Sequence, residues 1–280
     1  MKKFLSLILC LVMAFSLVAL ASCGDDETPP AASSTPGSTP SSTPGSVDNR
    51  PTVDNLGGMN AEQLYQAALN KVAELTNYRM DTVQTITMSA QGQTISFDQT
   101  VIAIKDGINE YVKTENEMES SANMEAWYID EMFYAIMGGT KAKAAISYDT
   151  YVEKYMPEGA TSEGALMNIP ADWFVDVKIY NVDGEYYLEF VVSGEEYLEY
   201  MSSTSLAGMI ESVDDLENIV YRVFFTEDGE LDNIVTEFAM TIQGIPADIV
   251  SVTEISNIGT AEITPPANPD SFIDVTDNLQ

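Results

Sequence analysis

The chain has 280 residues, of which 44 are acidic, 12 are basic and none is histidine, so its formal net charge is −32. This balance excludes a nucleic-acid partner, because phosphate binding needs clustered Lys and Arg. The lack of histidine removes the usual general base near neutral pH and the commonest imidazole metal ligand. We therefore expect no catalytic residue, no metal site, no cofactor and no enzymatic activity.

The N-terminal segment has the layout of a secretory signal: a basic start, an uncharged and mostly apolar run over residues 4–20, and small residues before Cys23. The sequence Leu20-Ala21-Ser22-Cys23 resembles the bacterial lipobox. This resemblance implies that Cys23 carries a diacylglycerol and anchors the mature chain on the extracytoplasmic face of the cell membrane. Two alternatives stay open. One is ordinary secretion after Ala19-Leu20-Ala21, and the other is a retained helix, for which about 17 residues are the lower limit of a span.

Composition divides the chain into three parts. Residues 1–22 form the signal peptide, residues 23–54 form the lipidated cysteine and a disordered tether, and residues 55–280 form one α+β domain. The tether is rich in Ser, Thr, Pro and Gly and repeats Ser-Ser-Thr-Pro-Gly-Ser at positions 33–38 and 41–46. It has too few apolar residues to offset the entropy of ordering. An O-glycosylated stalk is the alternative to a plain spacer.

A helix opens the folded part. Asn60 can cap it and Gln63 can reach back to the cap, as in a capping box. Apolar residues then recur at helical spacing towards an expected end near Asn77. They are Leu64, Ala68, Leu69, Val72 and Leu75.

Beyond this helix the apolar period changes from 3.6 to 2, which indicates strands. The first alternating run contains Ile95, Phe97, Val101 and Ala103 and leads to Asp106-Gly107. Alternating runs also flank Asp183-Gly184, Asp228-Gly229 and Asp130-Glu131. Asp-Gly favours hairpins with type I′ turns, in which both central residues have positive φ. We therefore expect a large antiparallel sheet with one buried and one solvated face.

Two more helices are expected between the strands. Ser193-Gly194-Glu195-Glu196 has the form of a capping box, and an apolar stripe follows it up to Ile210. A short helix is expected over residues 148–155, before Pro157. A sheet that covers these helices with its apolar face would bury both surfaces, so the fold class is α+β, a large antiparallel β-sheet packed over two or more α-helices.

Three stretches carry a family resemblance. They are Trp127-Tyr128-Ile129-Asp130-Glu131-Met132-Phe133-Tyr134, then Asp228-Gly229-Glu230-Leu231 before a long alternating strand, and Ile255-Ser256-Asn257-Ile258-Gly259 leading to Ile263-Thr264-Pro265-Pro266. They resemble extracytoplasmic lipoproteins of the LolA/LppX-type fold, and more closely an uncharacterised DUF6612-like group of Gram-positive bacteria. The resemblance implies a strongly curved, half-closed sheet around inward helices. It also implies a cavity that holds acyl chains or glycolipids in better-studied relatives.

The hypothesis that follows is a non-enzymatic, membrane-anchored lipoprotein that binds or carries a hydrophobic or lipid-like ligand between sheet and helices. It would act as a monomer, with the membrane and the lipid as its partners. The candidate cavity residues are Leu64, Ala68, Val72, Leu198, Met201, Met209, Ile210, Phe238 and Met240. Methionine adapts to irregular partners, but the same residues can simply fill a core. The alternative function is a cell-envelope module with a solid core that binds protein or glycan.

Overall fold

The computed structural model describes residues 50–90, 93–118, 123–155, 174–197, 213–226, 231–242 and 244–276. In this part of the chain 14 strands form one sheet. Every pair of neighbouring strands is antiparallel except β7 and β14, which are parallel. The predicted α+β fold with a large antiparallel sheet is therefore confirmed.

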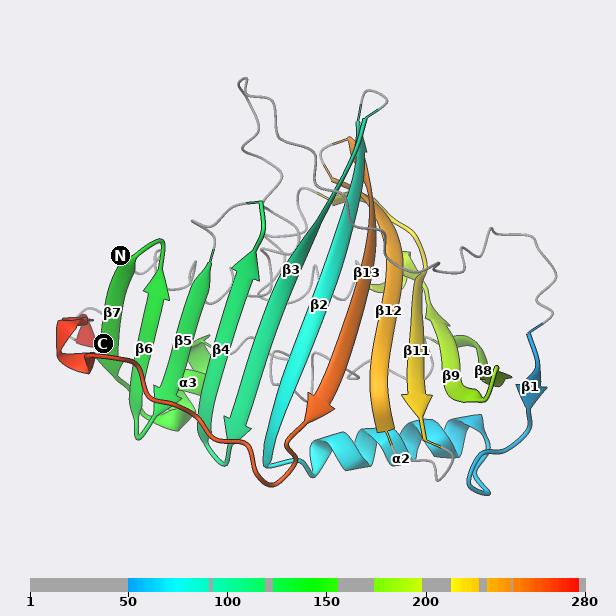
Figure 1. Ribbon diagram of the computed structural model, residues 1–280, viewed down its shortest axis with the longest axis horizontal. Helices are drawn as coiled ribbons and strands as arrows, with labels where there is room; N and C mark the ends of the chain where they lie inside the picture. Colours follow the sequence, from blue (N-terminus) through cyan, green and yellow to red (C-terminus); the bar gives the residue numbers. More distant parts are fainter. Residues whose placement is uncertain are drawn as a thin grey trace.

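The strand order shows how distant parts of the chain meet (Figure 1). From one edge to the other it is β1 (Thr52–Val53), β8 (Phe174–Val182), β9 (Glu185–Val192), β11 (Ile219–Phe225), β12 (Leu231–Ile242), β13 (Ile245–Ser256), β2 (Asn77–Ala90), β3 (Gln93–Asp106), β4 (Asn109–Asn116), β5 (Met124–Ile129), β6 (Met132–Met137), β7 (Thr140–Ala145) and β14 (Ile273–Asp274). A further strand, β10 (Val213–Leu216), pairs with β12. The late strand β13 thus lies beside the early strand β2 at the centre of the sheet.

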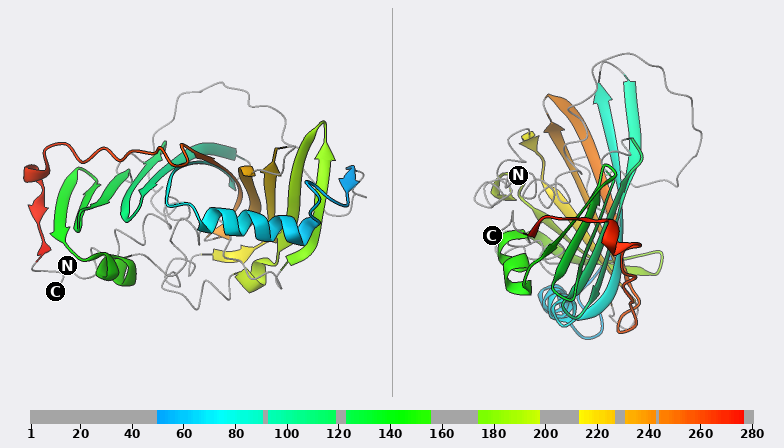
Figure 2. Two further views of the ribbon diagram at one scale, coloured as in Figure 1. Left: turned by 90° about the horizontal axis from the view of Figure 1, so that it is seen from below. Right: turned by 90° about the vertical axis from the view of Figure 1, so that its left-hand side faces the viewer.

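The sheet is strongly curved and arches over two helices that lie on its concave side, α2 (Ala61–Ala73) and α3 (Tyr148–Tyr155) (Figure 2, left). The alternation of side chains along the strands also places both helices on one face of the sheet. Ile86 and Phe97 pack in one cluster with Leu64 of α2, and Tyr128 and Phe133 pack in another with Tyr151 of α3. All four strand residues face the same side of the ladder that runs from β2 to β6.

The ends of α2 are set by local interactions. Asn60 Oδ1 accepts a hydrogen bond from the Gln63 amide at 2.9 Å, and Gln63 Oε1 accepts one from the Asn60 amide at 3.1 Å. This is the predicted capping box, which satisfies two otherwise unpaired donors. The helix ends at Ala73, whereas the apolar spacing had predicted an end near Asn77. Asn77 instead begins β2, because pairing with β3 on one side holds it in extended backbone.

The hairpin turns agree with the sequence prediction at two positions and differ at a third. Asp183 and Gly184 have φ of 54° and 93°, and Asp130 and Glu131 have φ of 52° and 61°, so both turns have two positive φ values. The hairpin at Asp106-Gly107 forms, but Asp106 pairs with Asn109, so the turn residues are Gly107 and Ile108. Only Gly107 has a positive φ, 63°, so this turn is not type I′ as predicted. Asp228-Gly229 lies outside the described residues.

Two apolar clusters fill the concave side. The larger cluster lies between α2 and the neighbouring strands β8, β9, β11, β12, β13, β2 and β3. Its buried members are Leu56, Leu64, Tyr65, Ala68, Val72, Ile86, Phe97, Ile179, Leu188, Phe190, Val192, Leu216, Ile219, Tyr221, Val223, Phe225, Ile234, Met240, Ala247 and Ile249. The smaller cluster lies between α3 and strands β5–β7; its buried members are Met124, Ala126, Tyr128, Phe133, Ala135, Ala144, Ile146 and Tyr151. Within the described residues, no helix is both long and apolar enough to cross a membrane.

Candidate functional site

The predicted cavity residues of α2 lie on the stripe that faces the sheet. Leu64, Ala68 and Val72 follow one another at intervals of four residues and are 0%, 3% and 3% exposed. Met240 of β12 is buried in the same cluster, and Phe238 packs against it with partial exposure. The structure therefore brings these five predicted residues together on the concave side.

The other predicted residues, Leu198, Met201, Met209, Ile210 and the lipidation site Cys23, lie outside the described residues. The predicted helix that carries four of them does begin where expected, since residues 194–197 are helical. The Tyr197 amide donates to the Ser193 carbonyl at 3.0 Å, and the Glu196 amide donates to Ser193 Oγ at 3.4 Å. Tyr197 packs against the larger cluster, so this first turn is directed towards α2 and the sheet.

An aromatic group that sequence reasoning missed joins α2 to strands β8, β9 and β11. The ring of Tyr65 meets Phe174 edge-on at 4.8 Å and Phe190 at 5.4 Å, and Phe190 stacks on Tyr221 at 5.0 Å. Burial raises the pKa of Tyr65 to about 12. These rings form a rigid apolar wall, because T-shaped and stacked pairs hold their partners in defined positions.

A band of polar side chains crosses the concave face beside this wall. One register row of it joins Thr236, Ser251, Gln84, Gln99 and Asn116 from β12 to β4. The neighbouring row adds three threonines, Thr253, Thr82 and Thr114, and ends on Met124 of the smaller cluster. We call these eight residues the polar band. It begins at Tyr221 and Ile234 of the larger cluster and reaches the smaller one.

Two members of the polar band are buried without satisfying their hydrogen-bonding atoms. Gln99 is 1% exposed and Thr114 is 2% exposed. Gln99 Oε1 and Thr114 Oγ1 have no hydrogen-bond partner among the residues that the structure describes. By contrast, Thr82 and Thr253 hydrogen-bond each other at 2.9 Å. Leaving a buried polar group unpaired costs about 1–3 kcal/mol, so the two orphan atoms need an explanation.

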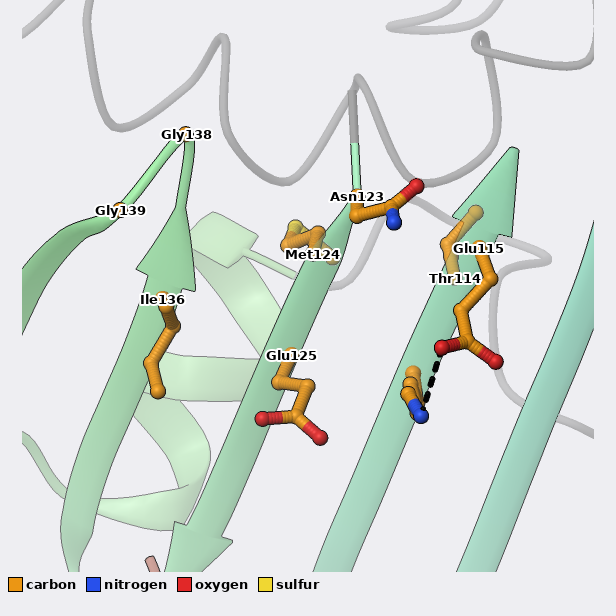
Figure 3. A pocket seen from close by; sticks show the side chains of 9 residues that line it. Thr114, Glu115, Asn123, Met124, Glu125, Ile136, Gly138 and Gly139 are labelled. Carbon is orange, nitrogen blue, oxygen red and sulfur yellow. Dashed lines mark ion pairs between the residues drawn. The ribbon is translucent and has the colours of Figure 1, made fainter. Parts of the chain in front are cut away.

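A groove of about 460 Å³ lies at one end of strands β4–β6 and touches the polar band (Figure 3). Its lining includes Thr114 and Met124, which belong to the concave face. By strand alternation Lys113, Glu115, Glu125 and Ile136 face the other side, and Asn123, Gly138 and Gly139 close the end. Lys113 pairs with Glu115 of the same strand, β4, at 2.8 Å. The volume lies within the range of small-molecule sites, about 300–1,000 Å³.

A charged cluster occupies the convex face behind the larger apolar cluster. Glu189 accepts bonds from Arg50 at 2.6 and 2.7 Å and from Arg222 at 2.7 Å, and Arg222 also pairs with Glu237 at 2.7 Å. Burial opposes the ionisation of Glu189, but the hydrogen bonds from Arg50 and Arg222 outweigh it and lower the pKa of this carboxyl. The guanidinium of Arg50 also lies 4.1 Å from the ring centre of Tyr180. Arg50 lies in the segment that the sequence assigns to the tether, and here it is bound to the sheet.

The smaller cluster contains a second buried polar contact. Tyr151 of α3 stacks on Tyr128 at 4.5 Å, and its hydroxyl donates to Glu110 Oε2 at 3.2 Å. Burial, followed by the charge of Glu110, raises the pKa of Tyr151 well above its ordinary value. A tyrosine held neutral in this way serves as a hydrogen-bond donor and not as a base.

Acidic residues do not gather into a metal site in the described part of the chain. No group of three or more Asp, Glu or Cys side chains there is placed to hold an ion. The acids of the turn at 227–230 lie outside the described residues. On the concave face, the two clusters supply apolar surface and the polar band supplies uncharged hydrogen-bonding groups, whereas Lys113, Glu115 and Glu125 line the groove from the other face.

Sequence reasoning missed Gln99, although a signal was present. The apolar positions of β3 run Ile95, Phe97, Val101 and Ala103, and position 99 is the one gap in this alternation. A polar residue at an inward position is either paired or functional. Thr114 had no comparable signal, because threonine is common on both faces of strands.

No protein-family model and no curated protein sequence matches this chain. Among solved structures, the lipoprotein LppX of Mycobacterium tuberculosis matches with 9% identity and a TM-score of 0.36, over 73% of this chain and 98% of its own. A LolA superfamily protein of Nitrosomonas europaea matches with 12% identity and a TM-score of 0.27, over 74% and 96%. A DUF1329 family protein of Desulfovibrio piger matches with 15% identity and a TM-score of 0.25, over 79% and 99%.

Proposed function

We propose that this protein is a non-enzymatic, lipid-anchored binding protein that holds an amphipathic ligand on the concave face of its sheet. The observation that carries the proposal is the pair of orphan polar atoms, Gln99 Oε1 and Thr114 Oγ1, between two apolar clusters. An amphipathic molecule fits both features, because its apolar part can lie along the clusters while its polar part satisfies the two atoms.

Ligand binding is tested by native mass spectrometry of the full chain purified from membranes. We expect an adduct of several hundred daltons that organic extraction removes and that returns when a fluorescent long-chain lipid probe is added to the extracted protein. Ala68→Phe adds a ring on the buried stripe of α2, where Ala68 is 3% exposed. This variant is expected to lower probe uptake at least tenfold, whereas Gln66→Phe on the exposed side of α2 leaves it unchanged.

The proposal is wrong if the native protein carries no adduct and the extracted, folded protein takes up no probe. Such a result would mean that the interior is packed and holds no ligand. It would favour the alternative function, a cell-envelope module that binds protein or glycan on its outer surface. If Ala68→Phe does not fold, the adduct and its reversible uptake by the unmodified chain still decide the question.

The membrane anchor is a separate part of the proposal. The motif at Leu20-Ala21-Ser22-Cys23 supports it, and two acyl chains suffice for stable anchoring. Cys23→Ser is expected to release the protein from the membrane fraction and to abolish labelling by an alkyne-tagged palmitate. Cys10→Ser is the matched control, because Cys10 lies in the signal and its loss should change neither result. Retained acylation in the Cys23→Ser variant would contradict the anchor.

A further inference from the structure

We infer that the headgroup of the ligand is uncharged and carries hydrogen-bond donors, and that Gln99 and Thr114 recognise it. This inference rests on the proposed function and deepens it by naming the ligand class. Gln99 lies on β3 and Thr114 on β4, and the register pairs Gln99 with Asn116 and Val101 with Thr114. The two residues are therefore diagonal neighbours, with backbones about 7–8 Å apart, which is a span that one small polar headgroup can bridge.

The charge of the band decides the charge of the headgroup. The two register rows that hold Gln99 and Thr114 contain threonine, serine, glutamine, asparagine and apolar residues, and none of their described members is charged. A carboxylate or phosphate buried here would lack a partner cation from these rows, and an unpaired buried charge costs far more than a neutral group. Arg222 lies on the opposite face, where Glu189 and Glu237 pair with it. Lys113 lines the groove beside Thr114, but it is already paired with Glu115, and Glu125 adds a second carboxylate to the same lining, so the groove does not favour an anion either.

The chemistry of the two unpaired atoms, Gln99 Oε1 and Thr114 Oγ1, decides which hydrogen-bonding groups the headgroup must carry. An amide oxygen such as Gln99 Oε1 only accepts hydrogen bonds, whereas a threonine hydroxyl donates and accepts. A ligand that satisfies both must offer at least one donor, as hydroxyl and amide groups do and esters do not. The groove of about 460 Å³ has Thr114 but not Gln99 in its lining, so it offers room for a headgroup at the Thr114 end of the pair.

The test compares three lipids that share one oleoyl chain and differ in the polar end. They are 1-oleoylglycerol, which is neutral and has hydroxyl donors, methyl oleate, which is neutral and has none, and sodium oleate, which is anionic. Binding to the extracted full chain is measured by native mass spectrometry and by displacement of the fluorescent probe. We expect 1-oleoylglycerol to bind about tenfold more tightly than either of the others, since two net hydrogen bonds differ between them.

Two substitutions assign the preference to the residues. In the double variant Gln99→Leu with Thr114→Val, affinity for 1-oleoylglycerol should fall about tenfold to the level of methyl oleate, whose own affinity should not change. The matched controls are Gln66→Leu, at an exposed position of α2, and Thr100→Val, on the convex face of β3. The thermal midpoint of the ligand-free double variant should stay level or rise, because it loses two unsatisfied polar groups. A purely structural role would lower that midpoint and leave the lipid ranking intact.

Each outcome is decisive. If the three lipids bind equally, or if oleate binds best, the headgroup inference is wrong while the proposed function stands. If none of the three binds to the folded protein and no adduct is found, the proposed function itself fails. If the double variant keeps the preference for 1-oleoylglycerol, Gln99 and Thr114 do not recognise the headgroup. If the variant does not fold, the ranking of the three lipids by the unmodified chain still tests the ligand class.

Discussion

The two halves of the sheet bury the same kind of apolar face but protect their convex face in different ways. Behind the larger cluster, charged side chains pair with one another: Glu189 binds Arg50 and Arg222, and Arg222 binds Glu237. Behind the smaller cluster, the convex face carries Trp127 and Tyr134, which lie opposite each other on β5 and β6. The C-terminal segment after β13 runs across this face instead, towards β7 (Figure 1).

The contacts of this segment explain the difference. Trp127 Nε1 donates to the Thr264 carbonyl at 3.0 Å, and Phe272 meets the ring of Tyr134 at 5.4 Å. β14 then pairs with β7 and covers the edge of the sheet. A wide, curved sheet therefore has no single solvated face. In the larger half, the outward rings of Tyr180 and Tyr187 stack on each other beside Arg50. In the smaller half, the outward side chains of Trp127 and Tyr134 contact the C-terminal segment.

The largest expected effect tests whether the two halves unfold together. Phe190→Ala removes a ring that packs against Tyr65, Phe174 and Tyr221, and we expect the free energy of unfolding to fall by about 4 kcal/mol in urea denaturation. Phe133→Ala makes the matching change in the smaller cluster. Both variants should unfold in one transition, because β2, β3 and β4 pair continuously between the halves. Two separate transitions would show that the halves are independent units.

The next effect tests the charged cluster. Glu189→Gln leaves Arg222 without one of its two carboxylates in a buried site, and we expect a loss of about 3 kcal/mol at pH 7. The pKa of Glu189 is lowered in the folded state, so its stabilisation is present above its ordinary pKa near 4.5 and is lost as the pH falls through the lowered value. The stability gap between the variant and the unmodified chain should therefore close in acid. Glu185→Gln, at an exposed position on the same strand, should have no such gap.

A smaller effect tests the covering segment of the other half. Asn77 donates to the Ala261 carbonyl at 2.9 Å and accepts from the Ala261 amide at 2.7 Å. Asn77→Ala should cost about 2 kcal/mol and should speed amide hydrogen exchange over residues 259–265, because the buried Ala261 amide loses its partner. Asn233→Ala, whose side chain bonds only to its neighbour Asp232 among the contacts observed, serves as the control. Unchanged exchange in the Asn77 variant would mean that this pair does not hold the segment.

The smallest effect concerns the helix of the larger half. Asn60→Ala removes the cap of α2 and should cost about 1 kcal/mol, measured by thermal unfolding. Gln63→Ala removes only the reciprocal bond and should cost less. If both variants are neutral, packing against the sheet and not the capping box fixes the start of α2.

Local signals predicted the elements well and the site only in part. The capping box at Asn60 and Gln63 and the positive-φ turns at Asp183-Gly184 were correct because each depends on residues within one turn of chain. The turn at Asp106-Gly107 was misplaced by one residue, because the register of β3 against β4 and not the turn sequence selected the pair Asp106 and Asn109. The stripe of Leu64, Ala68 and Val72 was found from its spacing, whereas Gln99 and Thr114 were not.

By itself the sequence determined the helix after Asn60, the alternating strands and the acidic composition, while the signal peptide over residues 1–22 stays a prediction. Only the tertiary structure decided which strands meet and which polar residues are buried. Nothing near β2 in the chain indicates that β13 lies beside it, and nothing in the tether composition indicates that Arg50 binds Glu189, 139 residues later. The physical reason is that capping and turn chemistry act over a few residues, while burial depends on partners that only the folded sheet brings together.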